Sequence, residues 1–347
     1  MSALPRRAFF GLRLASGRRA FSREGAHVAA ALVGSAAARA GIVAGDVVAR
    51  VGDVVIDSAS AWAEASRRAG AHEAVEVEIL RGAARRVVEI AASPWPHETL
   101  DGASVEHGHV VVRGARLRTI VTTPDVASRA PTGRSPAVLY LQGISCDSIE
   151  LPPSTPTPVR RLVHGLGASG FVTMRVEKRG VGDSEGGVPT RVDFETELDG
   201  FRAALAALRA RDDVEADAVF LFGHSVGASV APLLGCETPV RGVVVFGATA
   251  VPWLDELERT TRRQLALREV AAEDVERVVA LQRASLARDP DATMILGRTA
   301  AYHRQLGRVD LAAAWRSLAA PTLVLAGEHD WVVAEDEARE VADLARA

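Results

Sequence analysis

Apolar positions along the chain change their spacing at the sequence Ser93-Pro94-Trp95-Pro96. Upstream of it, five short apolar runs predict β-strands, at residues 10–14, 27–32, 47–51, 75–80 and 86–90. A helical segment at 59–69 lies among them. The two prolines disfavour continuation of a helix or strand, so residues 93–101 are predicted to form a linker. The pattern therefore predicts a small β-rich domain over residues 8–92.

Downstream of the linker, apolar runs and helical segments alternate. A hairpin is predicted first, with strands at 105–113 and 116–122 and a turn at Gly114. Buried parallel strands are then predicted at 137–141, 172–176, 218–222, 243–246 and 322–326. Helices are predicted at 159–168, 194–210, 228–234 and 309–318. This alternation predicts a doubly wound α/β sheet over residues 102–347, interrupted by a mostly helical insertion at about 252–307.

The composition excludes several classes of function. A net charge of −3 over 347 residues implies no basic face, so no nucleic-acid partner is expected. Cys146 and Cys236 provide neither a disulfide framework nor metal-ligand spacing, and no metal or organic cofactor is expected. No apolar run approaches the roughly 18 residues of a membrane span. The first residues lack an apolar stretch of signal-peptide length, so we expect a cytoplasmic protein.

The segment GSAAARAGIVAGDVVARVGD at residues 34–53 combines small alanines, suited to a short packed helix, with turn residues. Gly41 and Gly45 supply turn conformations, and Asp46 can hydrogen-bond within that turn. The segment resembles the central signature of bacterial PDZ domains. The resemblance implies that an extended peptide adds to a sheet edge, with the backbone amides of Phe10, Gly11 and Leu12 receiving its carboxylate. The alternative is a domain that only packs on the rest of the chain.

A strand-turn-helix pattern surrounds Ser225. The sequence Gly223-His224-Ser225-Val226-Gly227 follows the apolar run at 218–222 and precedes a helix of small residues. The pattern resembles the nucleophile elbow of serine α/β-hydrolases, in which two glycines let strand and helix approach around a strained turn. The resemblance implies that Ser225 is the nucleophile, and His224 is expected to have a packing role. The alternative is a tight turn with an incidental serine.

Two loops near this serine match the same family in part. After the third strand, Gln142-Gly143-Ile144 stands where α/β-hydrolases have a His-Gly sequence before the oxyanion loop. The resemblance implies that the backbone amides of Ile144 and Val226 face the oxyanion, whereas the alternative is an ordinary β-turn. Cys146 is expected to be a small buried residue. Residues 175–186 resemble a D-x-R-G-x-G-x-S turn, with Glu177 in place of the aspartate, and a structural role is expected.

The family resemblance also implies a triad acid. Residues 321–330 resemble the strand and loop that carry it, so Asp330 would orient the base histidine. A helix N-cap is the alternative role. The residues after Asp330 contain no histidine, His329 is too close to it in sequence, and His303 lies in the insertion. Either the last strand and its histidine are absent from this sequence, or the protein is a non-catalytic relative; we expect the former.

These motifs together resemble serine α/β-hydrolases of the esterase and serine-peptidase type. The resemblance implies cleavage of an ester, thioester or amide through an acyl-enzyme. The insertion would form a cap over the serine, with Trp253, Leu254 and Leu257 either lining the substrate pocket or packing on the sheet. The rival hypothesis is a non-catalytic hydrolase fold that serves as a PDZ-type binding module.

Overall fold

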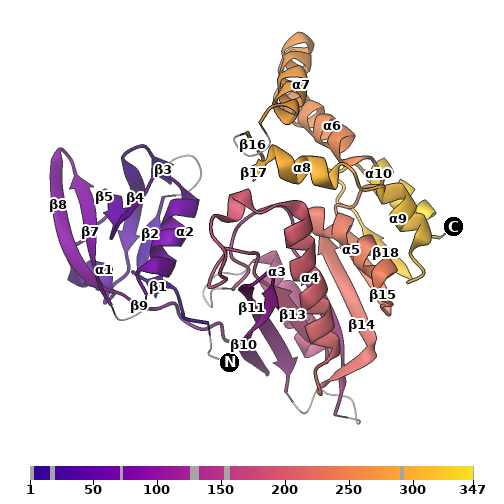
Figure 1. Cartoon of the computed structure of the whole chain (residues 1–347), viewed down its shortest axis with the longest axis horizontal. Coiled ribbons are helices and arrows are strands. Elements are labelled where there is room, and N and C mark those ends of the chain that lie inside the picture. The colour runs from indigo at the N-terminus through magenta and orange to yellow at the C-terminus, as the bar shows by residue number, and fades with distance from the viewer. Residues whose placement is uncertain are drawn as a thin grey trace. The chain divides into compact units, whose positions relative to one another are not determined.

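The chain folds as two compact units, each with its own hydrophobic core (Figure 1). The computed structural model describes residues 4–15, 20–70, 73–125, 133–151, 157–289 and 293–346. Unit 1 comprises Met1–Glu98 together with Arg179–Pro189. Unit 2 comprises Thr99–Lys178 and Thr190–Ala347. Each unit is described by itself.

Unit 1 is built on an antiparallel sheet with the strand order β2-β4-β5-β7-β8. These strands are β2 Leu12–Leu14, β4 Gly25–Ala31, β5 Val47–Val51, β7 Ala74–Arg81 and β8 Ala84–Ala91. The short strands β3 Phe21–Ser22 and β6 Val54–Val55 pair with β4 and β5. Two helices accompany the sheet, α1 Ala36–Arg39 and α2 Ala59–Arg68. The predicted β-rich domain is therefore present, and all five of its predicted strands occur, that at 47–51 with the predicted ends and the other four with shifted ends.

The turn between α1 and β5 confirms the role expected for Asp46. Its Oδ2 accepts a hydrogen bond from the Val43 amide at 2.9 Å, and its Oδ1 pairs with Arg81 at 2.7 Å. The Arg81 guanidinium lowers the pKa of the Asp46 carboxyl, although burial opposes this. Gly41 and Gly45 both have positive φ, at 79° and 91°, which accounts for glycine at these positions.

The predicted linker is partly wrong, because its first residues are paired. Ser93–Pro94 forms β9, which pairs antiparallel with β1 Ala8–Phe9. The Trp95 amide then donates to the Arg7 carbonyl at 2.9 Å, and the Arg7 guanidinium lies 4.3 Å from the centre of the Trp95 ring. Proline lacks an amide donor but its carbonyl still accepts, so it fits a short two-stranded edge. The proline-based prediction missed this pairing.

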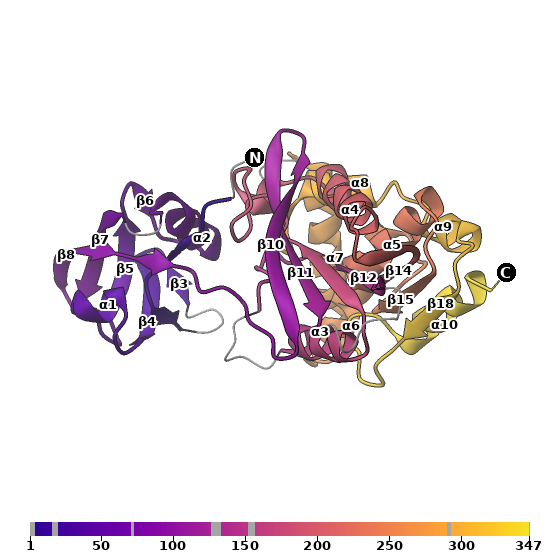
Figure 2. The ribbon, with the colours of Figure 1, turned by 90° about the horizontal axis from the view of Figure 1, so that it is seen from below.

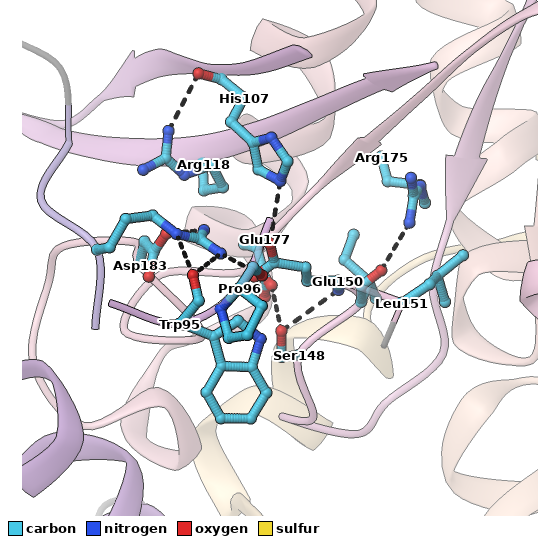
Figure 3. Close-up of polar contacts among 12 residues, drawn as sticks. Trp95, Pro96, His107, Arg118, Ser148, Glu150, Leu151, Arg175, Glu177 and Asp183 are labelled. Carbon is cyan, nitrogen blue, oxygen red and sulfur yellow. Dashed lines mark hydrogen bonds and ion pairs between the residues drawn. The ribbon is translucent and has the colours of Figure 1, made fainter. Parts of the chain in front are cut away.

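The segment Arg179–Pro189 groups with unit 1, whereas the sequence had placed it in the hydrolase domain. Within unit 1, the Asp183 carboxylate pairs with the Arg6 guanidinium at 2.5 Å and accepts from the Arg7 amide at 3.0 Å. The Trp95 carbonyl, which lies near Asp183 in Figure 3, also accepts a hydrogen bond from Arg6 at 3.0 Å. Charged contacts were expected for this turn, but their partners lie in a distant part of the sequence.

Unit 2 contains a seven-stranded sheet with the order β10-β11-β13-β12-β14-β15-β18. Its strands are β10 Ala103–Val112, β11 Ala115–Pro124, β12 Ser135–Leu141, β13 Val172–Val176, β14 Val214–His224, β15 Gly242–Phe246 and β18 Thr322–Leu325. The first two form the predicted hairpin, and Arg113 and Gly114 at its turn both have positive φ. From β13 to β18 all neighbouring strands are parallel, as predicted.

Helices cover both faces of this sheet. Helix α3 (Pro158–Ala168) packs on β11 and β13, and α4 (Phe194–Arg209) packs on β10 and β13; Figure 2 shows them on opposite sides of the strands. Helix α5 (Val226–Glu237) packs on β14 and β15, and α9 (Leu311–Ser317) packs on α5. Helix α10 (Glu335–Leu344) packs on β18. The doubly wound architecture predicted from the sequence is confirmed.

The insertion is mostly helical, as expected, and three of its residues, 290–292, lie outside the described residues. Its elements are α6 Trp253–Ala266, α7 Ala272–Ala287, the hairpin strands β16 Met294–Ile295 and β17 Arg298–Thr299, and α8 Ala300–Leu306. A short 3-10 turn, Pro189–Arg191, precedes α4. Among the helices of the described residues, none is both long and apolar enough to cross a membrane.

Candidate active site

Ser225 occupies a strained turn between β14 and α5. Its φ of 56° and ψ of −124° lie in a region that L-residues rarely adopt. The Ser225 amide donates to the Phe246 carbonyl at 2.9 Å, and the Ser225 carbonyl accepts from the Ala228 amide at 2.7 Å. Such strain persists only where the surrounding structure fixes it, and it is concentrated at functional sites. The turn therefore has the local geometry predicted from the Gly-x-Ser-x-Gly pattern.

Two glycines make this turn possible. A Cβ on Gly227 would stand 2.0 Å from the Leu141 carbonyl oxygen, and one on Gly223 would stand 2.5 Å from the Gly227 oxygen. These contacts involve backbone atoms, which cannot rotate away as a side chain does. Strand β12, the end of β14 and the start of α5 thus approach more closely than any larger residue would allow.

The loop after β12 lies directly against Ser225. A Cβ on Gly143 would stand 3.1 Å from Ser225 Cβ and 3.5 Å from Ser225 Oγ. Ile144 follows in this loop, and Val226 is the first residue of α5. Gln142 is buried and donates from Nε2 to the Ser145 carbonyl at 3.3 Å. Its side chain therefore supports the loop from within.

Asp330 lies on a turn after β18, held by backbone donors. Its Oδ1 accepts hydrogen bonds from the amides of Val332 at 2.8 Å and Val333 at 3.1 Å. The N-cap residue of α10 is Ala334, so Asp330 is not the helix cap that the sequence left open. A Cβ on Gly247 would lie 3.8 Å from the Ser225 amide nitrogen and 4.0 Å from Asp330 Oδ2. The serine and the carboxylate therefore flank the same glycine.

Ser225 and Asp330 line one pocket of about 440 Å³. The other lining residues are His224, Phe246, Gly247, Gly327, His329, Trp331, Val332 and Val333. Trp331 is half-exposed at its rim. Sequence reasoning missed Phe246, the last residue of a predicted strand, and Trp331, which directly follows Asp330. Trp253, Leu254 and Leu257 do not line this pocket; they belong to the core cluster of unit 2 or pack on it, so the packing interpretation of these residues is favoured.

Three histidines of unit 2 are candidate partners of the serine. The His224 ring stacks on Phe246 with centroids 5.8 Å apart, and burial lowers the pKa of its imidazole while the Asp330 charge opposes this. His303 is fully buried between Trp253 Nε1 at 3.1 Å and the Ile295 carbonyl at 2.8 Å. His329 lines the pocket. Of the described histidines, none is hydrogen-bonded to Ser225.

Comparison with protein-family models gives a match to the family described as serine aminopeptidase, S33, over residues 158–347. The chain belongs to this family. The matched stretch contains both Ser225 and Asp330, whereas the Gly143 loop precedes it. Unit 2 is accordingly an α/β hydrolase, as predicted from the sequence. The PDZ resemblance of unit 1 stays a prediction.

Esterases are among the curated and solved proteins to which this S33-family chain is similar. The esterase EstD of Thermotoga maritima is 26% identical over 239 residues, which are 69% of this chain and 55% of the relative. The chain thus spans about half the length of the curated relative it matches. The esterase Pf2001 of Pyrococcus furiosus aligns with a TM-score of 0.48 at 15% identity, over 72% of this chain and 82% of that one. Est1E of Butyrivibrio proteoclasticus aligns with a TM-score of 0.48 at 14% identity, over 71% and 86%.

The predicted peptide-binding residues of unit 1 lie at the start of its end strand. Phe10 is buried and its ring lies 5.5 Å from that of Trp62 on α2. Gly11 has a φ of 77°, and a Cβ there would stand 2.1 Å from Ser35 Cβ. Leu12 begins β2, which pairs with β4 on one side and ends the sheet order on the other. Leu12 therefore lies on an end strand of the sheet, directly after Phe10 and Gly11, and peptide binding there stays a prediction.

Proposed function

We propose that unit 2 is a serine hydrolase that cleaves an ester through an acyl-enzyme, with thioesters and amides as the wider substrate class. The observation that carries this proposal is the strained turn of Ser225, which faces a pocket shared with the Asp330 carboxylate. A non-catalytic serine would not need a backbone conformation that costs of order 1–3 kcal/mol. The esterase activity named for the Thermotoga maritima relative favours esters within this class.

The proposed reaction begins at Ser225. Ser225 Oγ attacks the substrate carbonyl carbon while its proton passes to an imidazole base. The carbonyl oxygen becomes an oxyanion, which the Ile144 and Val226 amides and the N-terminus of α5 stabilise. The bond to the alcohol then breaks, the alcohol takes the proton, and a water molecule hydrolyses the remaining acyl-enzyme. Asp330 orients the base and stabilises its imidazolium form.

The identity of the base is the open part of this proposal. His224 and His329 are the described histidines that line the pocket. The His224 ring is engaged with Phe246, and His329 directly precedes the acid. Because none of the described histidines is hydrogen-bonded to Ser225, the serine hydroxyl stays protonated, and hydrolysis by the 347-residue chain is expected to be slow. A pocket of about 440 Å³ has room for free imidazole beside the Asp330 carboxylate.

Imidazole rescue tests the proposal. Imidazole should accelerate two reactions of the wild-type protein, labelling by a fluorophosphonate and turnover of p-nitrophenyl acetate. Both rates should be well above those of Ser225→Ala at the same imidazole concentration. The His224→Ala and His329→Ala variants then show whether either histidine acts as the base in the reaction that occurs without imidazole. Labelling that persists in Ser225→Ala contradicts the proposed nucleophile. So does a wild-type rate of ester turnover that equals the rate of Ser225→Ala both with and without imidazole.

We propose a second function for unit 1, the binding of an extended peptide at the β2 edge. The Phe10 carbonyl accepts from the Ala37 amide at 3.0 Å and the Gly11 carbonyl from the Leu32 amide at 2.8 Å. In a planar trans peptide the carbonyl and the next amide point in opposite directions. The Gly11 and Leu12 amides are thus directed away from those contacts, where a peptide carboxylate could accept from them.

A peptide library tests this second function. The full chain is titrated with fluorescent peptides that have free or amidated C-termini. Binding tighter than about 1 mM, roughly −4 kcal/mol, that needs the free carboxylate is expected. Arg13→Glu, in the middle of β2, serves as the control because β-sheet addition uses main-chain groups. Equal binding of both peptide forms, or none, contradicts the carboxylate role.

A further inference from the structure

A buried cluster of charged side chains lies behind the Gly143 loop. Lys178, which follows β13, pairs with Glu197 of α4 at 2.8 Å, and Arg298 of β17 pairs with the other oxygen of the same carboxylate. Their side chains are 2%, 2% and 1% exposed. Tyr302 of α8 donates to Glu197 at 3.2 Å, and the Arg298 guanidinium lies 4.5 Å from the centre of the Tyr302 ring. Three separate parts of unit 2 thus meet at one carboxylate.

Both cations also bind consecutive carbonyls of the loop beside Ser225. Lys178 Nζ donates to the Gly143 carbonyl at 2.5 Å, and Arg298 Nε donates to the Ile144 carbonyl at 3.0 Å. A trans peptide directs its carbonyl and its amide to opposite sides. Because Lys178 holds the Gly143 carbonyl, the Ile144 amide in the same peptide plane points away from the cluster. Gly143 itself lies against Ser225, so this amide is on the loop that borders the serine.

A contribution to stability does not by itself explain this buried cluster. Burying an ion costs several kcal/mol, and well-packed apolar residues often replace buried ion pairs without loss of stability. Here two cations, Lys178 and Arg298, pair with the same carboxylate. Burial lowers the pKa of Lys178, and the Glu197 carboxylate counteracts that shift. A cation behind an oxyanion loop favours the negative charge that develops during ester cleavage.

We propose that Lys178 and Arg298, joined by Glu197, are positioning residues that hold the Ile144 amide toward the oxyanion. This inference rests on the proposed serine hydrolase function. It gives the insertion a role beyond covering the sheet, because β17 supplies Arg298. It also explains why the chain has a lysine at position 178, its only lysine, where the turn motif specifies no particular residue.

The test compares transition-state and ground-state effects in the full chain. Lys178→Met removes the donor and the charge at similar length. With imidazole present, the second-order rate constant for fluorophosphonate labelling of Ser225 should fall roughly 10–100-fold, less than the 10²–10³-fold of a lost oxyanion donor. Binding of an aryl trifluoromethyl ketone, which forms a tetrahedral oxyanion on the serine, should weaken in proportion. The KM for p-nitrophenyl acetate should change less than about threefold.

Two further variants separate positioning from general loss of structure. Glu197→Gln keeps the shape of the cluster and should lower the labelling rate roughly 3–10-fold. This variant therefore tests the inference if Lys178→Met fails to fold. Arg118→Met removes a buried arginine that donates to the His107 and Gly108 carbonyls on β10 instead. It should leave the labelling rate per folded molecule unchanged.

The possible results of these experiments distinguish failure of this inference from failure of the proposed function. Lys178→Met and Glu197→Gln that label at the wild-type rate overturn this inference while the nucleophile assignment stands. A rise in the KM for p-nitrophenyl acetate that is as large as the loss of ketone affinity also overturns it, because a merely structural role would weaken both. Wild-type protein that is not labelled at Ser225 contradicts the proposed function and this inference with it.

Discussion

The two sides of the candidate active site differ in how they are held. On the nucleophile side, Ser225, Gly143 and Gly227 lie among backbone atoms of β12, β14 and α5 at contact distance. On the acid side, Asp330 follows β18, the last strand in the sheet order, whose Leu323 is 55% exposed. The turn of Asp330 is held largely by helix α6 of the insertion. Val332, which donates to Asp330, accepts through its carbonyl from Thr260 at 3.0 Å and from Arg263.

The comparison shows that a short sequence motif encodes the nucleophile, whereas tertiary contacts position the acid. A Gly-x-Ser-x-Gly turn contains its own constraints within five residues. The acid turn depends on side chains about 70 residues upstream, as the sequence separation of 72 between Thr260 and Val332 shows. Substitutions should therefore act mainly on folding at the first side and mainly on activity at the second.

The largest effect is expected from Gly227→Ala. The added methyl group would meet the Leu141 carbonyl oxygen at 2.0 Å, and neither β12 nor α5 can move without breaking the turn. Unit 2 should lose roughly 3–5 kcal/mol or fail to fold. Urea denaturation followed by tryptophan fluorescence measures this loss. Gly165→Ala in α3, where a Cβ meets nothing within 4 Å, is the control and should not destabilise.

Asp330→Asn should leave the fold intact but impair reaction at the serine. The amide can still accept the Val332 and Val333 hydrogen bonds, but it no longer stabilises an imidazolium. Imidazole-supported labelling should fall by roughly 10²–10⁴-fold with little change in urea midpoint. A labelling rate near that of wild type would show that another group serves as the acid, and the asymmetry between the two sides would then disappear.

The sequence predicted the locally encoded parts of this molecule well. The run at 172–176 coincides with β13, and the elbow at Ser225 has the strained conformation that its glycines imply. The pairing of Ser93–Pro94 was missed because a two-residue strand leaves no periodicity to read. The cluster of Lys178, Glu197 and Arg298 was missed because its members are up to 120 residues apart and each resembles an ordinary surface charge in sequence.

A pH effect is expected at the contact between α6 and α10. Burial, together with the neighbouring Glu337 charge, raises the pKa of Glu256 to about 7 from a normal value of 4.5. Between these values the folded protein keeps a proton that the unfolded chain has released. The free energy of unfolding should therefore fall as pH rises from about 4.5 through 7, by an amount on the order of 3 kcal/mol.

Glu256→Gln should remove this contribution, because the amide does not titrate. Denaturation of wild type and variant at pH 5 and pH 8 gives the difference in slope. Glu335→Gln, at the exposed start of α10, is the control and should keep the wild-type slope. Parallel slopes for wild type and Glu256→Gln would mean that Glu256 ionises normally and does not link pH to the helix that supports the acid turn.

The smallest effect is expected at the exposed end strand, from Leu323→Ala. Leu323 on β18 is 55% exposed, whereas Leu139 on β12 is 0% exposed in the centre of the same sheet. Removing a buried leucine side chain costs the transfer free energy plus that of the cavity, typically 2–5 kcal/mol, so Leu139→Ala should be severely destabilising. At Leu323 most of that surface already contacts water, and less than about 0.5 kcal/mol should be lost. If Leu323→Ala instead costs more than about 2 kcal/mol in urea denaturation, the side chain is covered in solution. The acid side of the site would then be as firmly packed as the nucleophile side.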